Sequence, residues 1–102
     1  MKHFLIKYQF TTGSEEEWKQ EVGRFIAAVE ADPALKGKMS YRAMKNAEGT
    51  DYYHLAAVED DAVGTLQERD FFKKYTDKTE IVGGGAVEVV PMAIVAETAH
   101  RA

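Results

Sequence analysis

The order of hydrophobic patterns along the 102-residue chain is what most constrains its fold. Alternating apolar residues are typical of strands, and apolar residues three and four apart are typical of helices; here the patterns read strand, helix, strand, strand, helix, strand. Two strand–helix–strand units with right-handed crossovers predict an α+β fold, a ferredoxin-like βαββαβ domain with a four-stranded antiparallel sheet in the order 4-1-3-2. Both helices are expected on one face of that sheet. The expected strands span 2–10, 38–46, 52–59 and 86–97, and the expected helices span Ser14 to about Ala31 and Asp60 to about Ile81.

Local signals support the element boundaries. Ser14 followed three residues later by Glu17 forms a capping box, which predicts a helix start. In the second helical segment, Gly64 lowers helix stability, so we expect an irregular or broken helix near Arg69. Pro91 lies inside the last strand and cannot donate to a ladder, so that strand is expected at a sheet edge or with a bulge.

The two middle strands are predicted to form a hairpin. If Gly49 is the bulge residue of a three-residue loop, Arg42 lies opposite His54 and Met44 lies opposite Tyr52. A slip of one residue would reverse the faces. In this register the other face carries Tyr41, Ala43, Tyr53, Leu55 and Ala57.

One face of the sheet is expected to pack on the helices, which leaves the other face exposed and apolar. A single domain, 1–97, with a C-terminal tail, 98–102, is too small for a second core. A second copy is the simplest cover for the exposed face, so we expect a homodimer rather than a monomer with an open sheet. The residues predicted on this face are Leu5, Met44, Tyr52, Val58, Met92 and Ile94.

Composition and charge exclude several kinds of partner. The net charge is -4 and the basic residues are scattered, which disfavours nucleic acid as a partner. No apolar stretch approaches the roughly 20 residues that span a bilayer, and the N-terminus does not resemble a signal peptide, so we expect a cytoplasmic protein without membrane contact. There is no cysteine, nucleophile elbow or phosphate-binding loop.

The stretch from Val58 to Lys73, VEDDAVGTLQERDFFK, follows a tyrosine-containing strand and precedes a glycine-led last strand. It resembles the dimeric α+β barrel superfamily, specifically the antibiotic biosynthesis monooxygenase-like group. Thr12-Gly13 ahead of the Trp18 helix is also similar to that group's first turn. The resemblance implies two sheets that close into a barrel across a dimer. It also implies a small, often aromatic, substrate bound between a sheet and its helices or within the barrel.

The same resemblance argues against haem. Leu66 stands where many members have histidine and the haem-degrading members have tryptophan, and Thr76 stands where those enzymes have their ligand histidine. Their first-strand asparagine corresponds to Ile6 or Tyr8. We therefore expect no cofactor.

The candidate catalytic residues are His54, Arg42 and Tyr52. A histidine beside a tyrosine and an arginine is suited to take a proton from a phenol or enol and hold the anion. Strands one and three are expected to run parallel, which would bring His3 to the same end of the pocket as His54. Without a third ligand two sheet histidines do not make a metal site, and His100 lies in the tail. The candidate substrate-binding residues are His3, Lys7, Met44 and Glu88.

Each of these residues also has an ordinary structural role. His54 is also suited to be a cross-strand partner of a hydroxyl or carboxylate, and Lys7 and Arg42 are also suited to be solvated or paired with Glu88; for each of them the structural role is the more common one. Three functions stay open: a cofactor-independent monooxygenase-like enzyme acting on a small aromatic or enolic substrate, a dimer that binds a small ligand without transforming it, and a purely structural role.

Overall fold

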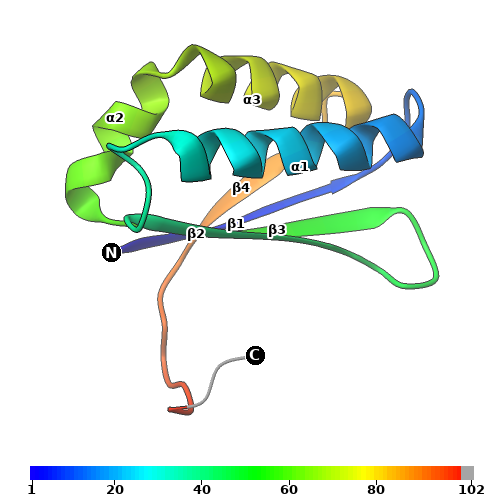
Figure 1. Cartoon of the computed structure of the whole chain (residues 1–102). Helices are drawn as coiled ribbons and strands as arrows, with labels where there is room; N and C mark the ends of the chain where they lie inside the picture. The colour runs from blue at the N-terminus through cyan, green and yellow to red at the C-terminus, as the bar shows by residue number, and fades with distance from the viewer. Residues whose placement is uncertain (100–102) are drawn as a thin grey trace.

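The protein, seen here as a computed structural model that describes residues 1–99, has an antiparallel sheet with helices on one side (Figure 1). The strand order is β2-β3-β1-β4, so the predicted ferredoxin-like topology is confirmed. Between β3 and the helices that follow it lies a short 3-10 turn, η1. The elements are β1 (Lys2–Gln9), α1 (Glu15–Ala31), β2 (Met39–Lys45), β3 (Asp51–Val58), η1 (Asp60–Ala62), α2 (Val63–Glu68), α3 (Asp70–Val82) and β4 (Glu88–Met92).

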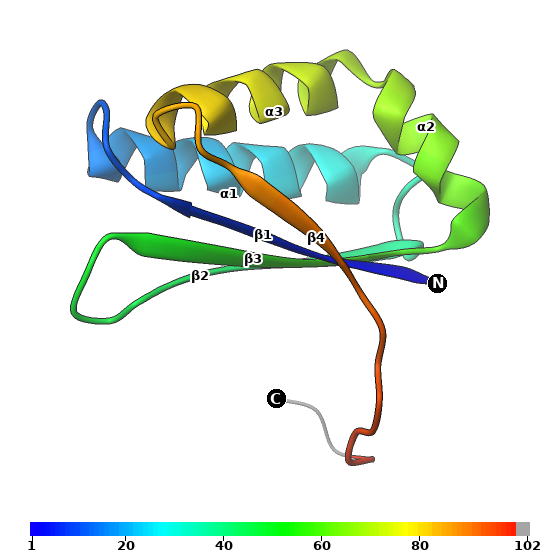
Figure 2. The same cartoon turned by 180° about the vertical axis from the view of Figure 1, so that it is seen from behind.

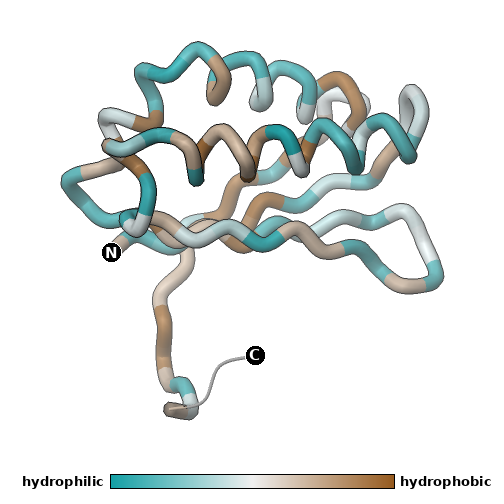
Figure 3. The backbone as a smooth tube through the Cα atoms, viewed as in Figure 1, coloured by the Kyte–Doolittle hydropathy of each residue, from teal (hydrophilic) through white to brown (hydrophobic). Residues whose placement is uncertain are grey.

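The two faces of the sheet differ completely in what covers them. All the helices lie on one face, and from behind the opposite face is seen to be bare (Figure 2). The chain leaves β4 on this bare side, and hydrophobic residues continue into the segment after the strand (Figure 3). There Ile94 and Val95 are exposed. No helix of the described residues is long and apolar enough to cross a membrane.

Helix α1 begins and ends where its sequence signals predict. The Oγ of Ser14 accepts a hydrogen bond from the backbone N–H of Glu17 at 3.2 Å, which satisfies one of the free N–H groups of the first turn. The helix ends at Ala31, and the next residue, Asp32, has an extended backbone ahead of Pro33.

The second helical segment is broken at Arg69, as predicted. Arg69 has an extended backbone, with φ -74° and ψ 130°, and separates α2 from α3. Its Nε donates to Oδ2 of Asp32 at 2.6 Å, which ties the break to the end of α1.

The predicted register of the β2–β3 hairpin is wrong by one residue. Ala43, not Arg42, lies opposite His54, and Tyr53, not Tyr52, lies opposite Met44. The cause is the loop: Gly49 does not have a positive φ and is no bulge residue. The backbone N–H of Asn46 instead bonds the carbonyl of the first β3 residue at 2.8 Å, which closes a longer loop.

A slip of one residue exchanges the faces of a strand. Tyr52, His54 and Val58 are therefore buried beneath the helices, and the expectation that Tyr52 and Val58 lie on the open face is wrong. Tyr41 and Ala43 also lie on the helix side. Tyr53, Leu55 and Ala57 lie on the open face, together with Arg42 and Met44.

Strands β1 and β3 run antiparallel, so the expected parallel pairing is wrong. The β2–β3 hairpin makes β3 antiparallel to β2, and the crossover through α1 makes β2 parallel to β1. As a result His54 lies opposite Ile6, whereas His3 lies opposite Ala57 on the other face. The two histidines do not share a pocket.

The last strand is an edge strand, as its proline predicts, but it is shorter than 86–97. Pro91 lies opposite Phe4 in the pairing with β1. The described residues after Met92 form no ladder. Of the predicted tail, 98–102, residues 100–102 lie outside the described part of the chain.

Candidate functional site

A row of hydrogen-bonding aromatic side chains crosses the core around His54, which is fully buried. The indole Nε1 of Trp18 donates to the Tyr8 hydroxyl at 2.8 Å, and that hydroxyl lies 2.9 Å from Nε2 of His54. On the other side of the ring, Nδ1 lies 2.5 Å from the Tyr41 hydroxyl and 3.3 Å from the Tyr75 hydroxyl. The Tyr41 and Tyr75 hydroxyls are 2.8 Å apart. We call these five side chains the His54 network.

The His54 network is uncharged at neutral pH. Burial lowers the pKa of His54 to about 4, so its ring is neutral at pH 7. Burial also raises the pKa of Tyr8, Tyr41 and Tyr75 far above the usual range for a phenol. All three hydroxyls therefore keep their protons and can donate them in hydrogen bonds.

Aromatic packing holds Tyr75 in place. Its ring stacks on Phe25, with centroids 4.0 Å apart and planes 3° apart, and on Trp18 at 5.6 Å and 11°. Trp18 and Phe25 lie two turns apart on α1 and so share one face of that helix. Helix α1 thereby fixes a hydroxyl that belongs to α3.

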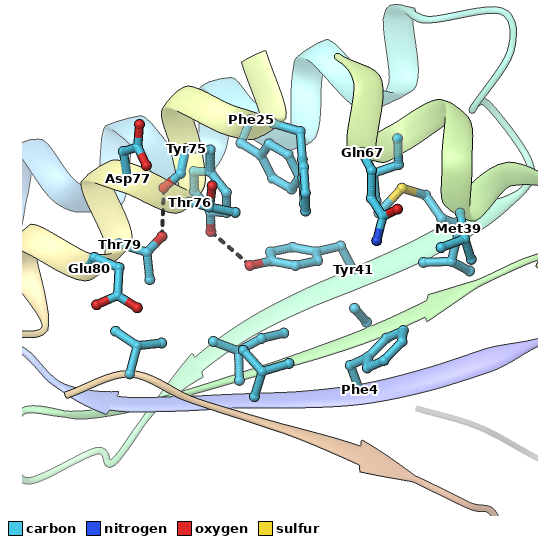
Figure 4. Close-up of a pocket in the computed structure, with 18 residues that line it drawn as sticks. Phe4, Phe25, Met39, Tyr41, Gln67, Tyr75, Thr76, Asp77, Thr79 and Glu80 are labelled. Carbon is cyan, nitrogen blue, oxygen red and sulfur yellow. Dashed lines mark hydrogen bonds between the residues drawn. The ribbon is translucent and has the colours of Figure 1, made fainter. Parts of the chain in front are cut away.

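A cavity of about 330 Å³ adjoins the His54 network, between the sheet and helices α2 and α3 (Figure 4). Its wall is mostly apolar, and several of the wall residues are small or β-branched, which leaves the space unfilled. Tyr41 and Tyr75 both belong to this wall. The apolar residues that contribute to it include Phe4, Ile6, Ala56, Val58, Val63, Leu66, Phe72, Val87 and Val89.

The polar residues of the cavity lie at its two ends. Gln67 is at one end, near Met39, and Asp77 and Glu80 are at the other (Figure 4). Thr76, Asp77 and Glu80 are exposed, so this end faces solvent. Among the described residues that line the cavity there is no lysine or arginine. The charged side chains that line the cavity are therefore both negative, Asp77 and Glu80.

Of the predicted catalytic residues, two lie on the cavity side of the sheet. His54 is separated from the cavity by Tyr41, which belongs both to the wall and to the network. The Tyr52 hydroxyl donates to Oε2 of Glu15 at 2.7 Å, and Lys45 Nζ donates to the same oxygen at 2.8 Å. Tyr52 thus anchors the start of α1 and does not line the cavity.

The remaining predicted site residues lie on the open face of the sheet. Arg42 pairs across β2–β3 with Leu55, so the structure does not bring it to His54. Lys7 and Glu88 lie directly opposite each other, with Nζ and Oε2 3.4 Å apart, an ordinary surface ion pair. Met44 and His3 lie on the same face as this pair, away from the cavity.

The sequence analysis named neither Tyr75 nor Tyr41 as a site residue. A signal was present, since a buried tyrosine hydroxyl needs a hydrogen-bond partner and this chain has several tyrosines but only two histidines in its predicted strands, His3 and His54. Using that signal requires the correct β2–β3 register. Within residues 1–99 no three histidine or carboxylate side chains gather to hold a metal ion.

Comparison of sequences finds no relative: no family model matches the chain, and no curated protein matches it. Solved structures do match. SnoaB, a cofactor-independent oxygenase from Streptomyces nogalater, is 14% identical with a TM-score of 0.73, over 97% of each chain. A protein from Mycobacterium tuberculosis is 12% identical with a TM-score of 0.73, over 96% of this chain and 98% of that one.

A structure of an antibiotic biosynthesis monooxygenase also matches, at 10% identity and a TM-score of 0.73, over 94% of this chain and all of that one. The chain therefore has the fold of the antibiotic biosynthesis monooxygenase-like proteins, as its sequence resemblance implies. At these identities the likeness establishes the fold, and the activity has to be argued from the site.

Proposed function

We propose that this protein is a cofactor-independent, monooxygenase-like enzyme that binds a small aromatic or enolic substrate in the cavity beside the His54 network. The observation that carries the proposal is an apolar cavity of about 330 Å³ with the hydroxyls of Tyr41 and Tyr75 meeting at its wall. Apolar walls with a few converging polar groups are typical of small-molecule sites. The similarity in fold to a cofactor-independent oxygenase supports the same reaction class.

The proposed chemistry depends on the tyrosine hydroxyls at the cavity wall, which are hydrogen-bond donors. Oxygenation without a cofactor requires a substrate that supplies the electrons itself, as an enolate or phenolate can. Hydrogen-bond donors stabilise such an anion in a site shielded from water. Conversion of a CH₂ group beside a conjugated ketone to a carbonyl consumes one O₂ and releases one water. We assign the oxyanion contact to the Tyr75 hydroxyl, and place Tyr41 and His54 behind it as its support.

The charge at the opening restricts the substrate. Asp77 and Glu80 at the open end repel an anion, and no basic side chain among the described lining residues offsets them. The preferred substrate is therefore uncharged when it enters, and it forms its anion inside by giving its proton to the Asp77 or Glu80 carboxylate or to water at the open end.

The test is oxygen uptake with an enolisable aromatic ketone such as anthrone, together with detection of the quinone product. We expect uptake above the rate without protein, and its loss in Ala56→Leu, which fills the cavity wall. Ala27→Leu, on the exposed surface of α1, is the matched control and should keep full activity. No uptake by the wild-type protein with any enolic substrate would remove the proposed reaction.

A non-catalytic ligand-binding protein is the second candidate. One observation favours it: the pKa of His54 is about 4 and the pKa values of Tyr41 and Tyr75 are raised, so no member of the network titrates near neutral pH. A cavity wall formed by these groups can bind a ligand, but it offers no strong base to remove a proton from it. Saturable binding of aromatic ketones without oxygen uptake would decide for this candidate.

We also propose that two copies pair through the open face of the sheet. Large apolar side chains are exposed there, including Met44 (41% exposed), Leu55 (43%) and Met92 (47%). Contiguous apolar surface of this kind marks an interaction site. A twofold axis lets this one face cover itself, which would close the two sheets into a barrel.

A further inference from the structure

The hydrogen bonds of the His54 network can be followed donor by donor, starting from Trp18. An indole N–H only donates, so the Tyr8 oxygen accepts from it. Among the described residues, the other partner of the Tyr8 hydroxyl is Nε2 of His54 at 2.9 Å. The proton of Tyr8 therefore points at Nε2, which accepts it.

Because Nε2 of His54 accepts a hydrogen bond, the position of the ring's own hydrogen is determined as well. A neutral histidine whose Nε2 accepts carries its hydrogen on Nδ1, and Nδ1 faces the Tyr41 oxygen at 2.5 Å. The Tyr41 hydroxyl, having accepted from Nδ1, donates to the Tyr75 oxygen at 2.8 Å. The O–H of Tyr75 is then the end of the chain, at the wall of the cavity.

Each direction leaves one tyrosine proton without an acceptor among the described residues: that of Tyr75 in the direction above, and that of Tyr8 in the opposite one. If Nε2 carried the hydrogen, the Tyr8 oxygen would accept from both Trp18 and His54, and its own proton would have no acceptor among the described residues. Tyr75 lines the cavity, where a ligand or water can accept its proton, whereas Tyr8 is buried and does not line it. The indole of Trp18 and the cavity at Tyr75 therefore favour the same direction.

We propose that the cavity presents a directed donor, the hydroxyl of Tyr75, and therefore selects aromatic ligands with an acceptor oxygen, such as a ketone or quinone carbonyl. This rests on the proposed function in one respect, that the cavity is the ligand site. Trp18, Tyr8 and His54 are positioning residues, and Tyr75 is the residue that touches the ligand. An enolate oxygen accepts more strongly than a ketone, so the same donor favours the anion of the proposed reaction.

The first test measures the direction itself. Nitrogen-15 NMR of the histidine ring, assigned by comparison with His54→Gln, is expected to show hydrogen on Nδ1 and a bare Nε2. In Trp18→Phe the Tyr8 oxygen no longer has to accept from the indole, so a population with hydrogen on Nε2 should appear. Tyr52→Phe is the matched control, because that hydroxyl binds Glu15 and stands outside the network. Hydrogen on Nε2 in the wild-type protein, or no change in Trp18→Phe, overturns the inference.

The second test measures selectivity, by calorimetric titration with 1-tetralone and with tetralin, the same skeleton without oxygen. Tyr75→Phe should weaken tetralone binding about three- to ten-fold, the value of one hydrogen bond, and leave tetralin binding within about two-fold. Equal losses for both ligands, or none for tetralone, overturn the inference.

The two proposals fail separately. Absence of oxygen uptake with this selectivity intact removes the reaction and leaves the donor assignment in place. Hydrogen on Nε2 removes the donor assignment, whatever the oxygen uptake. If neither ligand binds, the cavity is not the ligand site and both proposals fall.

Discussion

Acidification is expected to destabilise the folded protein through His54. The pKa of His54 is lowered by burial from 6.5 to about 4. Between these values the unfolded chain binds a proton that the folded chain does not, so stability is complete above pH 6.5 and falls as the pH drops toward 4. A shift of this size corresponds to about 3 kcal/mol in all, of which about 2 kcal/mol is lost between pH 8 and pH 5.

The assay is urea unfolding followed by the fluorescence of Trp18, at one protein concentration because a dimer's stability depends on it. Carboxylates also contribute at acid pH, since ion pairs and hydrogen bonds lower the pKa values of Glu15, Glu21 and Asp32. Subtracting the curve of His54→Gln removes their contribution. The wild-type advantage over this variant should shrink by about 2 kcal/mol between pH 8 and pH 5.

A difference that does not change with pH would refute the reasoning, because it would mean that His54 titrates alike in both states. An NMR titration of the histidine ring reports the same pKa directly. It keeps the prediction testable if His54→Gln does not fold.

Two further predictions concern the rest of the molecule. Sedimentation of the wild-type protein should give twice the mass of one chain, and Leu55→Glu, on the open face, should give a monomer; a monomeric wild-type protein would contradict the proposed pairing. Gly83→Ala should lower the free energy of unfolding by about 1–3 kcal/mol, because its Cβ would lie 2.8 Å from Val87 Cγ2 and 3.1 Å from the Thr79 carbonyl oxygen. Gly64→Ala, with open space around the new Cβ, should instead raise it by up to about 1 kcal/mol; destabilisation by both would contradict the packing argument.

The fold could be predicted because its signals are local. Ser14 and Glu17 mark the start of α1, and Pro91 places the last strand at an edge. Each of these follows from the backbone preferences of one or two residues. The element order then leaves few topologies open.

The site could not be predicted as readily, because it depends on the register of the β2–β3 pairing and on how much space the side chains leave between the sheet and the helices. The conformation of Gly49 determines whether His54 faces Arg42 or Tyr41, and the residue type does not reveal that conformation. The cavity exists because Ala56, Thr79 and their neighbours do not fill the space between sheet and helices, a property of packing that no periodicity encodes.

The most direct test is a crystal structure of the protein with 1-tetralone. We predict the aromatic rings in the cavity between α3 and the sheet, with the ketone oxygen within hydrogen-bonding distance of the Tyr75 hydroxyl and Trp18 still donating to Tyr8. A ligand seated on the open sheet face, or one in the cavity whose oxygen points away from Tyr75, would contradict this description of the site.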